Sequence, residues 1–139
     1  MKLMKVSATV KSSVDHHEIV VKTNGNEKVM QLSARSSGHE SSISGGELLM
    51  LSMATCFCDE FYREAIKRNL QISGVEIIVN GEFGAEGEPG TNFTCSVKVA
   101  SDEPEDEIND LIQYTDQAAE IQKTLRKGVS VKLFKEVST

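Results

Sequence analysis

The side chains with the clearest potential for chemistry are three cysteines, Cys56, Cys58 and Cys95. Their number is odd and their spacing forms no disulfide framework, so we expect three free thiols in a reducing compartment. Cys56 is the candidate nucleophile, because a thiolate sulfur attacks electrophiles such as peroxides. The alternative is that Cys56 is a small apolar side chain within a core.

The surroundings of Cys56 in the sequence do not favour a thiolate. Cys56 lies about three turns inside a helix predicted for residues 44–69, where the helix dipole no longer acts. Asp59 and Glu60 are spaced to share its helix face, and nearby negative charge disfavours the thiolate. We therefore expect Cys56 to need a cation from elsewhere in the protein.

The other candidate groups have weaker patterns. Cys58 lies about 200° around the helix from Cys56, so we expect it to fill the core. Cys95 alternates with apolar residues of a predicted strand and is also expected in a core. His16 and His17 are adjacent, so strand alternation places them on opposite sides. No phosphate loop or metal-ligand spacing appears, and we predict neither a metal site nor a bound cofactor.

The predicted helix has a clear start and an apolar first half. Ser44 and Glu47 form a capping box, and Ile43 and Leu48 form its hydrophobic staple. The residues that follow would bury the helix on all sides. A chain of 139 residues is one domain, 1–139, that cannot easily enclose such a helix, so we expect a homodimer. These apolar residues are Leu48, Leu49, Met50, Leu51, Met53, Ala54, Cys56 and Phe57.

From Asp59 onward the helix is amphipathic and should reach solvent. Two i,i+4 ion pairs are predicted there, Asp59 with Arg63 and Glu64 with Arg68.

Antiparallel strands are predicted on both sides of this helix. Asn24-Gly25 indicates a tight hairpin between the second and third strands. In the strand at 91–100, Phe93, Cys95, Val97 and Val99 share one face. The predicted strands are 3–11, 17–22, 27–33, 74–83 and 91–100.

Two helical segments and a last strand complete the predicted order. Pro104 precedes an acidic first turn, which the helix dipole favours. Thr115-Asp116 is expected to cap a second segment that ends at Lys127-Gly128. The order βββ–α–ββ–αα–β predicts an α+β fold with antiparallel sheet and a long central helix. The inner residues are Ile108, Leu111 and Ile112 in the first segment, Ala118, Ile121 and Leu125 in the second, and Val129, Val131 and Leu133 in the strand.

The composition excludes some partners. The net charge of −6 comes without a basic cluster, which argues against nucleic acid and anionic membranes as partners. The sequence also shows no signal peptide and no apolar run long enough to span a bilayer, so we expect a cytosolic protein.

The stretch GGELLMLSMATC, followed by LQISGVEIIVNGEF, resembles the OsmC/Ohr family of thiol peroxidases and its OsmC-like branch. The resemblance covers nearly the whole chain. It implies an intertwined homodimer in which two central helices pack between sheets. It also implies that Cys56 is a peroxidatic cysteine that attacks organic hydroperoxides in a response to oxidative stress.

The chain departs from the family pattern at the residues that activate the thiol. Family peroxidases have an acidic residue ten positions before the cysteine, where this chain has Gly46, and Glu47 lies one position further on. They also use an arginine from the first strand pair, and Arg35 is the only arginine before the helix. The second family cysteine has no counterpart at residues 119–122.

We therefore name Cys56, Arg35 and Glu47 as candidate catalytic residues. The hypothesis is a one-cysteine peroxide-reducing protein that needs an external thiol. The alternative is a non-catalytic dimer with this fold that binds a small hydrophobic molecule.

Overall fold

The computed structural model describes residues 3–13, 16–33 and 40–135. The chain divides into two compact units, Met1–Glu47 and Leu48–Thr139. Within the described ranges, no helix has both the length and the apolar character needed to cross a membrane.

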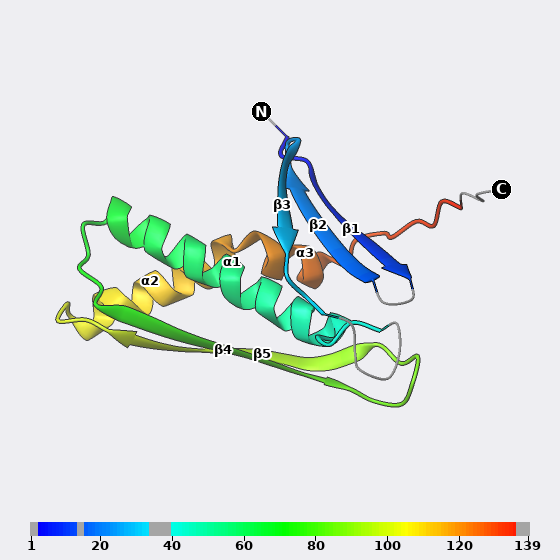
Figure 1. Cartoon of the computed structure of the whole chain (residues 1–139). Helices are drawn as coiled ribbons and strands as arrows, with labels where there is room; N and C mark the ends of the chain where they lie inside the picture. Colours follow the sequence, from blue (N-terminus) through cyan, green and yellow to red (C-terminus); the bar gives the residue numbers. More distant parts are fainter. Residues whose placement is uncertain (1–2, 14–15, 34–39, 136–139) are drawn as a thin grey trace. The chain divides into compact units, whose positions relative to one another are not determined.

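The first unit contains a three-stranded antiparallel sheet with the order β1-β2-β3 (Figure 1). Its strands are β1 (Val6–Ser13), β2 (His16–Thr23) and β3 (Asn26–Met30). Asn24 and Gly25 both have positive φ, 48° and 87°, as the predicted tight hairpin requires. The three strands confirm the prediction, although β3 ends at Met30, three residues before the predicted end.

The central helix α1 (Gly45–Lys67) begins with the predicted capping box. The backbone N–H of Glu47 donates to Ser44 Oγ at 3.1 Å, and the backbone N–H of Ser44 donates to Glu47 Oε1 at 2.9 Å. These two bonds satisfy backbone groups that the first helical turn leaves without partners.

The single chain does not bury the first half of α1 on all sides, and its burial in a homodimer stays a prediction. Only one stripe of α1 is buried, and it contains every fourth residue. Leu51, on another side of the helix, is 55% exposed. One chain supplies neighbours for one face of the helix, and the other apolar side chains stay partly exposed. The buried stripe is Met53, Phe57, Phe61 and Ala65.

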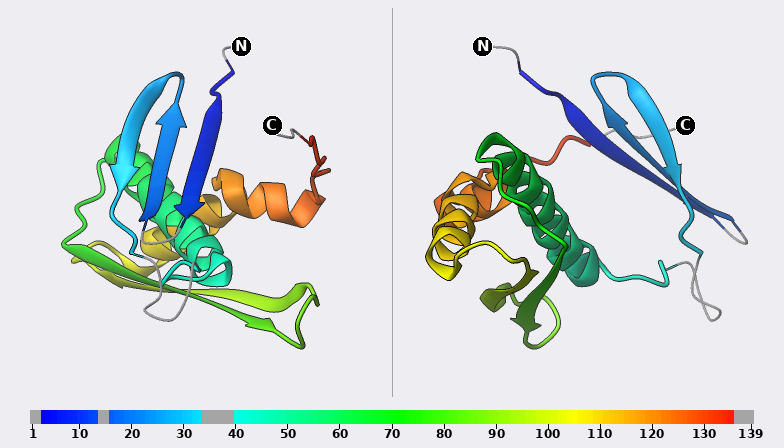
Figure 2. Two further views of the ribbon diagram at one scale, coloured as in Figure 1. Left: turned by 45° about the vertical axis from the view of Figure 1, so that its right-hand side comes forward. Right: turned by 90° about the vertical axis from the view of Figure 1, so that its left-hand side faces the viewer.

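The antiparallel hairpin of β4 (Gly74–Phe83) and β5 (Gly90–Ala100) confirms both predicted strands. Figure 2 shows α1 and α2 side by side over this hairpin. The inner face of β5 is the predicted one, and three of its members, Cys95, Val97 and Val99, pack against the core. The core centres on Phe57, Phe61, Ala65 and Leu111.

The helices α2 (Glu105–Ala118) and α3 (Glu120–Lys127) follow Pro104 as predicted. Their junction differs from the prediction. Thr115 does not cap α3, because its hydroxyl donates to the carbonyl of Leu111 at 2.7 Å and its side chain is buried. The helix instead breaks at Ala119, where ψ is 120°.

The inner residue of α3 is also not the predicted one. Gln122 is buried, whereas Leu125 is exposed. Beyond Gly128, whose φ is 70°, the predicted last strand does not form among residues 129–135. Despite its aliphatic alternation, this segment pairs with no strand of the part of the chain that the structure describes.

Candidate functional site

Cys56 lies in the middle of α1 and is half-buried. Nine residues separate it from Glu47, which corresponds to about 13.5 Å along the helix axis. The carboxylate of Glu47 holds the backbone at the start of α1. Within one chain, α1 therefore does not bring the Glu47 carboxylate to the Cys56 sulfur.

The candidate cation for this thiol cannot be placed, because Arg35 lies outside the described residues. The role of Arg35 at Cys56 stays a prediction.

The charges that follow Cys56 on α1 pair differently from the prediction. Arg63 pairs with Glu60, three residues earlier, and the expected pair with Asp59 is therefore wrong. The reason is geometric, because i,i+3 and i,i+4 neighbours both lie on one helix face. The cation of Arg63 partly offsets the negative charge of Glu60, which the sequence had placed on the face of Cys56.

The second predicted ion pair on α1, between Glu64 and Arg68, is confirmed. Arg68 also pairs with a residue of α2. Arg68 Nε lies 3.0 Å from Glu64 Oε2, and Arg68 Nη1 lies 2.7 Å from Asp110 Oδ2. The guanidinium also lies over the ring of Tyr114, with 5.1 Å between its Cζ and the ring centroid. Arg68 thus links the end of α1 to α2.

Gln122 links α3 to α1 close to Cys56, and the sequence reasoning missed it. Its side-chain nitrogen donates to the carbonyl of Met53 at 3.0 Å, one helical turn before Cys56. Its side-chain oxygen is buried and has no hydrogen-bond partner. The sequence contains a signal for the burial of Gln122, because this residue follows the buried Ala119 at helical spacing. The prediction for this helix was instead a buried stripe of aliphatic residues.

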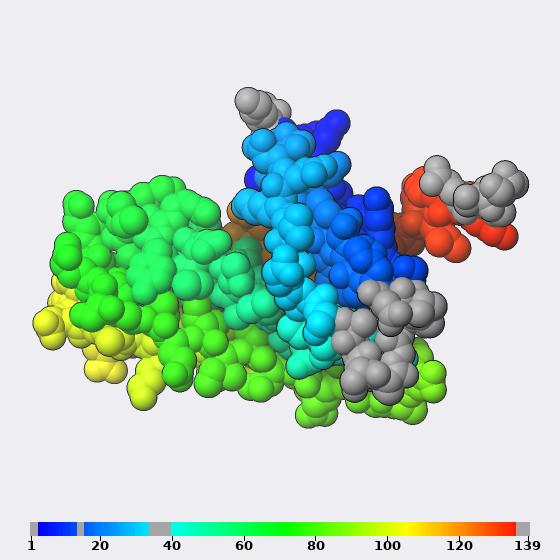
Figure 3. Space-filling model, viewed as in Figure 1, coloured from blue at the N-terminus to red at the C-terminus, as the bar shows by residue number. Residues whose placement is uncertain are grey.

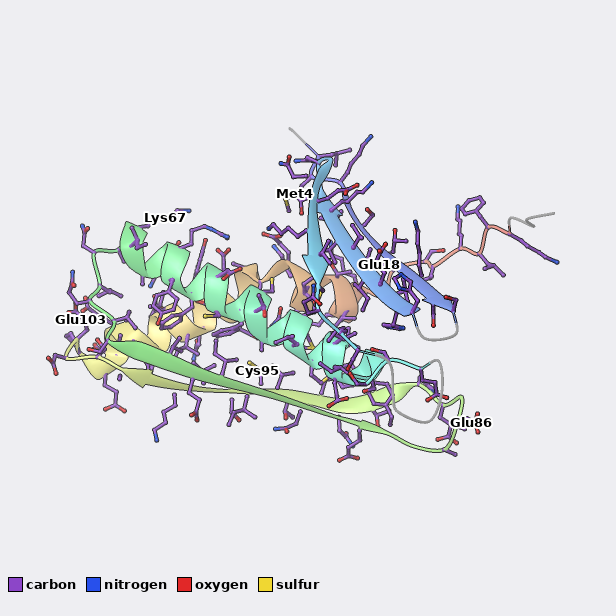
Figure 4. The ribbon with its side chains drawn as sticks, viewed as in Figure 1. Met4, Glu18, Lys67, Glu86, Cys95 and Glu103 are labelled. Atoms are coloured by element: carbon purple, nitrogen blue, oxygen red, sulfur yellow. The ribbon has the colours of Figure 1, made fainter. Side chains whose placement is uncertain are left out.

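The side chain of Cys95 points from β5 toward α1 (Figure 4). It lines a pocket of about 400 Å³ between β5 and α2. Burial raises the pKa of the Cys95 thiol, the charge of Asp116 raises it further, and Arg126 opposes this effect. Cys95 is therefore a poorer nucleophile than an exposed thiol at neutral pH. The other lining residues are Phe57, Val97, Ile112, Gln113, Asp116 and Gln117.

Cys58 is half-buried, and all three cysteines are free thiols. On helix geometry Cys58 projects about 200° away from Cys56. Cys58 is therefore not arranged as a second thiol on the face of Cys56.

His16 and His17 lie apart from this helix in the sequence. The imidazole Nε2 of His16 lies 3.8 Å from Glu18 Oε2 at an exposed position. Both ring nitrogens of His17 are buried without a hydrogen-bond partner. Among the described residues, no three or more His, Cys, Asp or Glu side chains gather as a group that could hold a metal ion.

Known structures share this fold. An OsmC-like protein from Mycoplasma pneumoniae has a TM-score of 0.65 and 13% identity, with 90% of this chain and 88% of that chain covered. An organic hydroperoxide resistance protein OsmC from Legionella pneumophila has a TM-score of 0.58 and 16% identity, with coverages of 91% and 92%. An OsmC-like hydroperoxide resistance protein from Jannaschia sp. CCS1 has a TM-score of 0.55 and 10% identity, with coverages of 96% and 93%.

No curated protein matches the sequence. The family model described as OsmC-like protein matches residues 38–134, which is more than half of the chain and includes all of α1. The predicted family resemblance and the α+β fold are thereby confirmed. The chain belongs to the OsmC-like family.

Proposed function

We propose that the protein is a thiol-dependent reductant of organic hydroperoxides in which Cys56 is the reactive sulfur. The observation that carries this proposal is the place of Cys56, half-buried on a central helix that lies within the family match. Two structural neighbours named as hydroperoxide resistance proteins support the substrate class.

The proposed reaction needs one protein cysteine and two equivalents of an external thiol. The Cys56 thiolate attacks one peroxide oxygen, the O–O bond breaks, and the alcohol leaves after taking a proton, so that Cys56 becomes a sulfenic acid. A first external thiol then displaces water and forms a mixed disulfide with Cys56. A second external thiol attacks that disulfide and releases Cys56 as a thiol.

The external thiol is required because the other cysteines are badly placed to resolve Cys56. Cys58 faces away on the same helix, and Cys95 packs against the core with a raised pKa. An intramolecular disulfide would need two Cα atoms within about 7 Å and aligned side chains. We therefore expect no rapid disulfide within the chain.

We also propose that the protein acts as a homodimer. Leu51 is 55% exposed on α1, and Ile66 on the same helix is 74% exposed. Exposed apolar side chains of this size along one helix are typical of an interface. A second copy of α1 would cover them.

A second candidate function is a binding module without catalysis. The pocket lined by Cys95 favours it, because a volume of about 400 Å³ fits a small molecule and Cys56 is not among its lining residues. In this case Cys56 would be a core side chain and the pocket would hold a small, partly apolar ligand.

The consumption of an organic hydroperoxide in the presence of a small dithiol separates the two candidates. Cumene hydroperoxide is a suitable probe, and dithiothreitol a suitable reductant. Turnover by the unmodified protein should be lost in Cys56→Ser and kept in the matched control Cys58→Ser. Equal background rates for all three proteins would contradict the peroxidase proposal and leave the binding module.

A further inference from the structure

The amide of Gln122 lies against the turn of α1 that precedes Cys56. Its side chain is only 2% exposed, and its nitrogen donates to the carbonyl of Met53 at 3.0 Å. An amide turned the other way would set its oxygen against that carbonyl, so the nitrogen is the atom that faces Met53. The side-chain oxygen of Gln122 is therefore a buried acceptor to which no described residue donates.

Helix geometry brings this amide next to the side chain of Cys56. Side chains of an α-helix lean toward its N-terminus, over the residues three and four positions earlier. Met53 is three positions before Cys56, so the Cys56 sulfur projects toward the carbonyl that Gln122 binds. Cys56 is half-buried, and Figure 3 shows part of α1, in green, at the surface of the molecule. A small molecule can therefore approach this thiol from solvent and meet a buried amide beside it.

Contacts at both ends of α3 hold Gln122 in place. Ala119, where the helix begins, is fully buried. Near the other end, the guanidinium of Arg126 donates to the backbone carbonyl of Asp116 at 3.1 Å and to its carboxylate at 2.8 Å. An acceptor on an element fixed in this way is positioned before a substrate arrives.

A buried acceptor without a donor is unfavourable, and such a group can have a catalytic role. The reaction proposed for Cys56 supplies a donor. The thiolate attacks the peroxide oxygen that bears hydrogen, the S–O bond forms as the O–O bond breaks, and the sulfur is oxidised by two electrons. The alkoxide leaves and takes a proton from water. The hydrogen stays on the transferred oxygen, so the same hydroxyl belongs first to the peroxide and then to the sulfenic acid.

We propose that the side-chain oxygen of Gln122 accepts a hydrogen bond from this hydroxyl, first in the bound hydroperoxide and then in the sulfenic acid of Cys56. The bond orients the reacting oxygen toward the sulfur and favours peroxides that carry an O–H group. This inference rests on the proposed function and adds a substrate-binding residue to Cys56.

Single-turnover kinetics of matched variants test this role. Gln122→Met keeps the length and helix preference of the side chain but removes the amide. Cumene hydroperoxide should oxidise Cys56 roughly fivefold more slowly in this variant, as the loss of one hydrogen bond implies. N-ethylmaleimide has no O–H or N–H group to donate, so its reaction with Cys56 should keep its rate. Peptide analysis measures both reactions at Cys56.

The matched control is Gln71→Met, the same exchange at an exposed residue, and it should leave both rates unchanged. Equal peroxide rates in Gln122→Met and the unmodified protein would overturn the inference and leave the proposed function standing. A parallel fall of both rates would overturn it too, because the amide would then only position Cys56. No oxidation of Cys56 in the unmodified protein would overturn the proposed function as well.

A measurement on the unmodified protein serves if Gln122→Met does not fold. The ¹³C resonance of a carbonyl moves downfield when the carbonyl oxygen accepts a hydrogen bond. In ¹³C-labelled protein, the side-chain carbonyl resonance of Gln122 should move downfield when cumene hydroperoxide converts Cys56 to the sulfenic acid. An unmoved resonance in the oxidised protein would overturn the inference.

Discussion

The two units of this protein differ in how much of their apolar surface they bury. In the described part of the first unit, Ile19 is the only buried apolar side chain, and every described residue of β1 is exposed. The second unit contains the other buried apolar residues, centred on Phe57, Phe61 and Leu111. Small sheets become independently stable through an apolar face or through packing against a helix. The second unit therefore has its own core, whereas the sheet of the first unit buries little apolar surface by itself.

Truncation of the core should have the largest effect. Phe61 is fully buried and stacks on Phe57, with ring centroids 6.4 Å apart. Phe61→Ala should lower the free energy of unfolding by about 3–5 kcal/mol, through lost burial and a cavity. The neighbouring Tyr62 lies at the surface, and Tyr62→Ala should cost much less. Urea denaturation followed by circular dichroism measures both, and equal losses would contradict the assigned core.

A charge on the exposed apolar side of α1 tests whether a second copy covers it. If Leu51 is buried between copies, Leu51→Asp places an unpaired charge there, at a cost of several kcal/mol, and the dimer should dissociate. The control Arg63→Glu breaks a surface ion pair, which is worth about 1 kcal/mol or less. Sedimentation measures both variants. A Leu51→Asp protein with unchanged sedimentation would show that this side of α1 faces solvent.

The activation of Cys56 is a smaller effect that depends on Arg35. If Arg35 is the cation that ionises the thiol, Arg35→Ala should slow alkylation of Cys56 near neutral pH by on the order of tenfold, because a nearby positive charge favours the thiolate. Arg126→Ala is a matched control, because that arginine pairs with Asp116. Iodoacetamide labelling with peptide analysis measures both. An unchanged rate would mean that Arg63, Lys11 or another cation serves, or that Cys56 is not activated.

The smallest expected effect concerns Cys95 and pH. Because burial raises the pKa of this thiol in the folded state, the unfolded chain ionises first as the pH rises above about 8.5. The unfolded state then binds fewer protons, so stability should be constant below that pH and fall above it, up to the raised pKa. Cys95→Ala should lack this part of the decline. Urea titrations at pH 7 and pH 9.5 test it, and identical pH dependence in both proteins would contradict it.

Local signals in the sequence predicted most of the elements. The capping box of Ser44 and Glu47, the Asn24-Gly25 hairpin and the alternation in β4 and β5 each specify structure through neighbouring residues. The errors arose where distant residues or another chain decide the outcome. The sequence shows that the first half of α1 is apolar on all sides, but it does not show how many sides one chain covers. The segment from Val129 has the alternating pattern of a strand. It can form a strand only where the free edge of another strand is available to pair with it.

The candidate site was less predictable than the fold. Cys56 was identified from the helix pattern and the family resemblance, whereas Gln122 was missed because a buried amide in a short helix looks like a surface residue. The pairing of Arg63 with Glu60 was missed because i,i+3 and i,i+4 partners compete on one helix face. Side-chain choices of this kind depend on the tertiary surroundings.

The central claim is that Cys56 is the sulfur that reacts with hydroperoxide, and one peptide map tests it most directly. The reduced protein is treated with one equivalent of cumene hydroperoxide in the presence of dimedone, digested, and analysed by mass spectrometry. We expect dimedone on Cys56, none on Cys95, and no disulfide between them. A protein with no modification at Cys56 even in excess oxidant would contradict the claim. A rapid, quantitative Cys56–Cys95 disulfide would contradict only the proposed need for an external thiol.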